Sequence, residues 1–147
     1  MVARRSSGLM FLIAFPLLLV PFALYNMLAF LLDVDFNLQA LSVPRLLGNR
    51  MAVSYGDILV LFSIFLLYFE ILKSTRMSTR AIMDHVLSLI LFMGMLIEFI
   101  VVPRAATSTF LIIAALSFVD VIGGFTITIR TAQRDVEFQD QRTMGPI

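Results

Sequence analysis

The segment "ATSTFLIIAALSFVDVIGGFTITIR", residues 106–130, is apolar almost throughout and holds a single acidic side chain, Asp120, ahead of Arg130. A helix of about 20 mainly apolar residues crosses the roughly 30 Å hydrocarbon layer of a bilayer. This segment is long enough and apolar enough to do so. The sequence therefore predicts a transmembrane helix here, and the rest of the fold is worked out from it.

Three further segments have the same character. They cover residues 8–32, 56–73 and 80–102. The whole chain is 60% hydrophobic, whereas soluble domains are usually about 45–50% apolar. The apolar runs do not alternate as barrel strands do, so we predict an all-α membrane protein. The expected architecture is an antiparallel four-helix transmembrane bundle forming one integral membrane domain over residues 1–147, with Pro16 and Pro21 bending its first helix.

The polar segments lie between and after these helices. Residues 33–55 contain two short, partly alternating runs on either side of Pro44 and Gly48-Asn49. Alternation around turn-forming residues indicates a small β-hairpin outside the lipid. A short interfacial helix is the alternative. The charged tail, residues 131–147, is expected to begin as a helix and then become disordered.

The distribution of Lys and Arg predicts the orientation, because short cytoplasmic flanks are enriched in both residues. One side of the predicted bundle carries Arg4, Arg5, Lys73, Arg76, Arg80, Arg130, Arg134 and Arg142. The other side carries Arg45, Arg50 and Arg104. We therefore expect both termini in the cytoplasm, an extracytoplasmic hairpin, and a location in the bacterial inner (plasma) membrane.

The composition argues against several classes of function. The chain has no Cys and only one His, which rules out disulfides and thiolate metal sites. Its net charge is +1, so no strong field attracts nucleic acid. Sequence motifs such as HExxH, GxSxG and the P-loop are absent. We therefore predict a protein that is not an enzyme, with no metal site, no cofactor and no nucleic-acid partner.

Asp120 is the carboxyl predicted deepest in the membrane. At 1.5 Å per residue it lies roughly 15 Å and 20 Å from the two ends of its helix. Ser117 and Gly124 share its face, and together with Gly123 and Asn26 they are candidate packing residues, because small side chains let helices approach closely. Asp120 is therefore expected to face protein. The candidate partners are Asn26, Tyr25, His85 and a neighbouring subunit.

Three more ionisable residues lie inside the predicted helices, where such residues are costly and often functional. Glu70 is three positions before Lys73, a spacing that allows an ion pair on one helix face. His85 is expected at the depth of Glu70, so that these two residues and Tyr68 can form one cluster. Glu98 lies near the opposite end of its helix, with Arg104 or Arg50 as its expected partner.

Two functions fit these features. The 14 Phe and 9 Met residues supply broad apolar surfaces, which suit contact with lipid and with other membrane subunits. The leading prediction is therefore an accessory, assembly or scaffold subunit of a membrane complex, either self-associating or docked on a larger complex. The alternative is a small proton- or cation-coupled transporter or channel that uses Asp120, assisted by Glu70, His85 and Glu98.

Overall fold

The computed structural model describes residues 15–46, 48–74 and 80–143. The first described element is helix α2 (Leu19–Asn26), which continues as a π-helical turn, η1 (Met27–Leu31). Strands β1 (Gln39–Pro44) and β2 (Arg50–Ser54) follow. The remaining elements are α3 (Tyr55–Ser74), α4 (Arg80–Val101), the 3₁₀ turn η2 (Pro103–Ala105) and α5 (Ser108–Thr143).

Three helices have the length and composition of membrane spans, as the sequence predicts. The apolar windows are Tyr55–Ser74 in α3, Met83–Val101 in α4 and Ser108–Ile127 in α5. Most of the residues in each window are not buried inside the protein, and many of the exposed side chains are large and apolar. Such a surface is suited to lipid, so the fold is that of a helical membrane protein.

The first predicted helix, 8–32, differs from the structure in its described part. Residues 8–14 lie outside the described residues. The helical portion runs from Leu19 to Leu31, eight α-helical and five π-helical residues, which corresponds to about 20 Å of helix. Pro16 precedes it and Pro21 lies in its first turn, where a missing N–H leaves no hydrogen bond unmade. Neither proline therefore bends the described helix.

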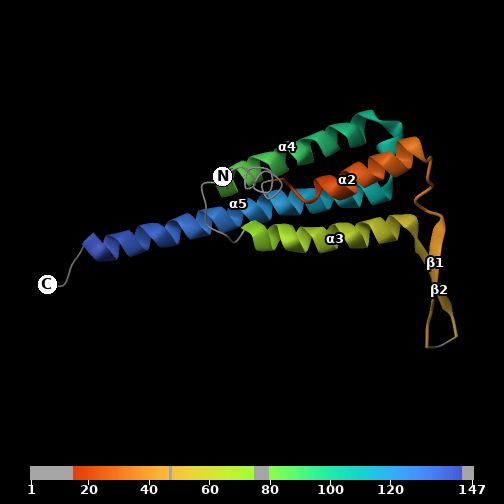
Figure 1. Ribbon diagram of the computed structural model, residues 1–147, viewed down its shortest axis with the longest axis horizontal. Coiled ribbons are helices and arrows are strands. Elements are labelled where there is room, and N and C mark those ends of the chain that lie inside the picture. The colour runs from red at the N-terminus through yellow and green to blue at the C-terminus, as the bar shows by residue number, and fades with distance from the viewer. Residues whose placement is uncertain (1–14, 47, 75–79, 144–147) are drawn as a thin grey trace, which may run out of the picture.

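The four helices run in alternating directions, and α5 lies between α3 and α4 (Figure 1). The largest helix contacts are those of α5 with α3 and with α4. Because α3 and α5 run the same way, this pair is parallel, although helices adjacent in sequence are antiparallel. The core lies between α2, α3, α4 and α5. Its fully buried side chains include Tyr25, Met95, Phe110 and Ile113.

Ring contacts define the register between α4 and α5. The rings of Phe99 and Phe110 are 6.2 Å apart between centroids, and those of His85 and Phe125 are 5.7 Å apart. Early residues of α4 therefore contact late residues of α5, and late residues of α4 contact early residues of α5. This is the antiparallel packing expected for helices joined by a short loop.

The start of α3 is held by a reciprocal cap. The Ser54 hydroxyl accepts the N–H of Asp57 at 3.1 Å, and the Asp57 carboxylate accepts the N–H of Ser54 at 2.8 Å. This is the capping-box arrangement at a helix N-terminus. Gly56 lies so close to Thr109 and Phe36 that a Cβ there would meet both. The cap and this contact fix the level of α3 relative to α5.

The predicted hairpin within residues 33–55 is confirmed. Strands β1 and β2 pair antiparallel, from Gln39 opposite Ser54 to Pro44 opposite Arg50. Gly48, in the turn, has a φ of 82°, a left-handed conformation that glycine adopts without penalty. The hairpin projects away from the helices (Figure 1).

Helix α5 is longer than the predicted 106–130. It continues through the first part of the charged tail to Thr143 and comprises 36 residues. Figure 1 shows its C-terminal part running beyond the ends of the neighbouring helices. The predicted helical start of the tail is therefore confirmed, while residues 144–147 lie outside the described residues.

Candidate functional site

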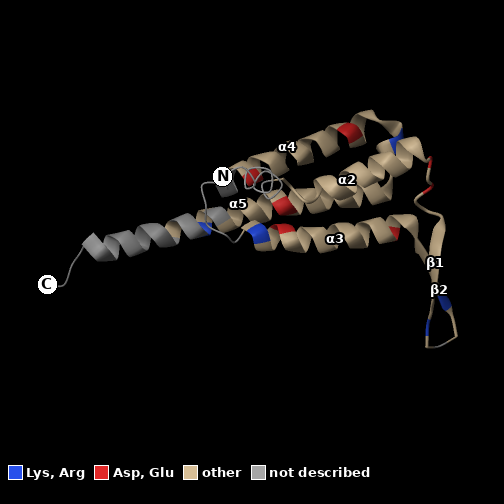
Figure 2. Cartoon of the chain, in the orientation of Figure 1, with Lys and Arg blue, Asp and Glu red and all other residues tan. Residues whose placement is uncertain are grey.

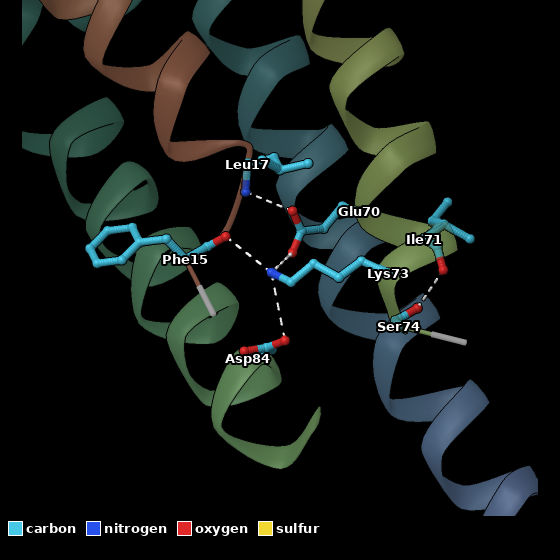
Figure 3. Close-up of polar contacts among 7 residues, drawn as sticks. All are labelled: Phe15, Leu17, Glu70, Ile71, Lys73, Ser74 and Asp84. Atoms are coloured by element: carbon cyan, nitrogen blue, oxygen red, sulfur yellow. Dashed lines mark hydrogen bonds and ion pairs between the residues drawn. The ribbon is translucent and has the colours of Figure 1, made fainter. Parts of the chain in front are cut away.

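Lys73 is held by acceptors from three parts of the chain (Figure 3). Its Nζ lies 3.1 Å from Glu70 Oε1 on the same face of α3, and 3.6 Å from Asp84 Oδ2 of α4. Lys73 also donates to the carbonyl of Phe15 at 3.1 Å. The other Glu70 oxygen accepts the backbone N–H of Leu17 at 2.6 Å. These contacts tie α3, α4 and the segment before α2 together.

The charged groups of Glu70, Lys73 and Asp84 are largely buried, so their pairing matters for stability. Glu70 is 4% exposed, and the side chains of Lys73 and Asp84 are 18% and 19% exposed. Removing charges from water is costly, and their attraction compensates only if the geometry is good and further hydrogen bonds are made. Glu70 meets both conditions because each of its oxygens has a donor.

Asp120 faces protein, as predicted, and Ser88, its described hydrogen-bond partner, was not among the candidates. The candidate contacts with His85 and a neighbouring subunit stay predictions. It is 5% exposed, and its carboxyl is hydrogen-bonded to the Ser88 hydroxyl of α4. Asn26 and Tyr25 contact residues at the opposite end of the bundle, so the prediction that either one pairs with Asp120 is wrong. The antiparallel register of α4 and α5 is the reason that Ser88 is at this level.

His85 packs directly on α5. It is 5% exposed, and a Cβ at Gly124 would overlap its ring. A Cβ at Gly123 would meet no atom within 4 Å. Of the two glycines predicted to serve in helix packing, Gly124 therefore lies at a close helix contact, whereas a side chain at Gly123 would have open space.

These side chains form one group, called here the charged cluster. Its members are Glu70, Lys73, Asp84, His85, Ser88 and Asp120. Figure 2 shows acidic residues of α3, α4 and α5 toward the end of the bundle opposite the hairpin, with a basic residue of α3 beside them. Sequence reasoning placed Glu70, His85 and Asp120 as candidates and missed the roles of Asp84 and Ser88. Tyr68 lies outside the cluster because it is 58% exposed.

Glu98 lies toward the hairpin end of the bundle. Its Oε2 accepts a hydrogen bond from Asn26 at 3.4 Å, and Asn26 also donates to the carbonyl of Phe22. Arg104, in the adjacent loop, pairs instead with Asp33 at 3.4 Å. Asn26 therefore joins α2 to α4 through this hydrogen bond. Among the described residues, Glu98 is bonded to the Asn26 side-chain amide and not to a basic residue.

An apolar core separates the two polar regions. Met95 and Ile113 are fully buried between them. Ser117, the remaining predicted packing residue, is 1% exposed, and its hydroxyl has no hydrogen-bond partner among the described residues. Ser63 donates back to the carbonyl of Leu59 in its own helix. The interior therefore consists of a charged end, a mainly apolar middle that includes two buried serines, and a second polar end.

The chemistry available at the charged cluster is that of ion pairing and proton exchange. Within the described ranges, no three His, Asp or Glu side chains are placed to hold a metal ion. No protein-family model, curated protein or solved structure matches the chain.

The contrast between the two glycines gives a first prediction. Gly124→Ala places a methyl group against the His85 ring and should destabilise the protein by about 1–3 kcal/mol, as overpacking does. Gly123→Ala should stabilise it by up to about 1 kcal/mol, because alanine is the better helix former. Thermal unfolding in mild detergent measures both variants. Equal effects of the two substitutions would contradict the described packing of His85.

A second prediction concerns the ion pair. Lys73→Met leaves two carboxylates without their cation and should cost about 3 kcal/mol. Adding Glu70→Gln should recover part of that loss, because one of the unpaired charges is then removed. Chemical unfolding of the single and double variants gives the coupling energy. Arg45→Met, on the exposed hairpin, is the control and should change stability by less than about 0.5 kcal/mol. An equally small effect of Lys73→Met would contradict the claim that this ion pair holds α3 and α4 together.

Proposed function

We propose that the protein is a non-enzymatic integral membrane protein that serves as an accessory or assembly subunit of a membrane complex. Its place is the bacterial inner membrane, with both termini in the cytoplasm. The observation that carries the proposal is the continuation of α5, as one helix, far beyond its apolar span.

Helix α5 supplies both an anchor and a projecting segment. Its apolar span is Ser108–Ile127, and the helix ends only at Thr143. The remaining 16 residues correspond to about 24 Å of helix. A lone helix of this length is marginally stable in water, so packing against another protein would favour it. The sequence distribution of Lys and Arg supports a cytoplasmic position for this segment.

The charged cluster supports the same function. It cross-ties α3 and α4 at the level from which the projecting part of α5 emerges. A bundle tied in this way offers a rigid base, and a rigid base presents a helix to a partner at low entropic cost.

Truncation provides the third prediction. Deleting residues 131–147 should leave the bundle folded but release bound subunits, because the projecting segment is lost. Native mass spectrometry of protein purified from its own membrane measures the bound mass. Leu46→Ser, at the exposed hairpin tip, is the matched control and should retain the bound subunits. A full-length protein that is only a bare monomer, or a truncated one that keeps its partners, would refute the proposal.

A second candidate function is proton- or cation-coupled transport through Asp120. The observation that favours it is the balance of charge in the charged cluster, where three carboxyl groups face one lysine and one histidine. An acidic excess within a membrane bundle suits the binding of a proton or a cation. The apolar core between the cluster and the hairpin end means that transport requires the helices to move.

The fourth prediction tests this candidate in proteoliposomes. Asp120→Asn should reduce flux driven by a pH gradient at least tenfold, because the amide cannot exchange a proton. Asp57→Asn, at the exposed start of α3, removes a carboxylate outside the charged cluster and should leave the flux near the native value. Native flux equal to that of empty liposomes would end this candidate.

A further inference from the structure

A cavity of about 360 Å³ lies at the hairpin end of the bundle, between the segment after η1 and the start of α5. Its polar lining includes Asp33, Asp35, Asn37, Arg104, Ser108 and Thr109. Volumes of this order are at the small end of the range for ligand sites. The cavity is far from the charged cluster, and none of the functions above uses it.

One side of the cavity is suited to an anion. The Arg104 guanidinium contacts Asp33 at 3.4 Å and is 57% exposed, so donors remain for a ligand among its five N–H groups. Ser108 and Thr109 belong to the first turn of α5, where backbone N–H groups lack helical acceptors and the helix dipole is positive. A phosphate group matches both features.

The other side is suited to a cation. Asp33 and Asp35 both line the cavity. Asp35 Oδ1 accepts two hydrogen bonds from Asn37, at 2.9 and 3.2 Å, which orients the carboxylate. With two carboxylates and one guanidinium, the lining favours a ligand that carries both an anionic group and an ammonium group.

The position of the cavity indicates where such a ligand comes from. Arg104 follows the apolar window that ends at Val101, and Ser108 begins the next one. Asp33 and Asp35 directly follow η1, which ends at Leu31. The carbonyl of the next residue, Phe36, accepts the N–H of Gly56 in the first turn of α3 at 3.0 Å. The cavity is therefore at the level where apolar spans meet water, which is the level of lipid headgroups.

We propose that this cavity binds a phosphoethanolamine group, with the phosphate at Arg104 and the start of α5 and the ammonium at Asp33 and Asp35. A zwitterionic membrane lipid is the source that its position favours. Free phosphoethanolamine carries the same group, and the experiment separates these two sources.

The test is lipid titration of the purified full-length protein, followed by native mass spectrometry. The probes are phosphatidylethanolamine and phosphatidylglycerol with identical acyl chains, and soluble O-phosphoethanolamine. The native protein should bind phosphatidylethanolamine at least tenfold more tightly than phosphatidylglycerol. Arg104→Gln should weaken phosphatidylethanolamine binding at least tenfold, whereas Arg45→Gln, on the hairpin, should leave it unchanged. Thermal unfolding without lipid verifies that each variant is folded.

Asp35→Asn is a second variant that keeps the test decisive if Arg104→Gln does not fold. It should remove most of the preference for phosphatidylethanolamine over phosphatidylglycerol, because only the former carries an ammonium group. Equal binding of the two lipids by the native protein, or native-like binding by both variants, would overturn the proposal. Competition by millimolar O-phosphoethanolamine would support the site and assign the group to a soluble source.

Discussion

The ammonium group of Lys73, held between the carboxylates of Glu70 and Asp84, is the constraint on which the rest of the structure depends. Charged groups are costly inside an apolar bundle unless they pair with one another. Pairing here joins α3 to α4, and the Leu17 N–H adds the segment before α2. This end of the molecule is therefore organised by charge, although most of its surface is apolar.

The position of α5 follows from the same constraint. With α3 and α4 joined by an ion pair at one end, α5 packs between them and supplies small or polar groups where it meets them. Gly124 makes room for the His85 ring, and Asp120 is bonded to Ser88. Toward the hairpin, Gly56 gives the same close approach between α3 and Thr109. An apolar core lies between these contacts, so the molecule has two polar ends with different chemistry.

The sequence predicted the three long spans and the hairpin because apolar length and turn residues are local signals. It also predicted that Asp120 faces protein and that Glu70 and His85 can form one cluster, since ionisable groups in apolar helices have few stable positions. The contact of Asp120 with Ser88 was missed because it depends on the register of α4 against α5, which no local pattern encodes. Within the described residues, the first helix begins later than predicted, at Leu19. Apolar composition alone does not show where a helix starts near prolines such as Pro16 and Pro21.

Cysteine cross-linking in native membranes tests the described register most directly, since the natural chain contains no cysteine. A Cβ built at Gly124 lies 3.3 Å from Cγ of His85, so the pair His85→Cys and Gly124→Cys should form a disulfide under mild oxidation. The pair His85→Cys and Gly123→Cys, displaced by one residue onto an open face, should not. Cross-linking of the second pair but not the first would contradict the register that brings the charged cluster together.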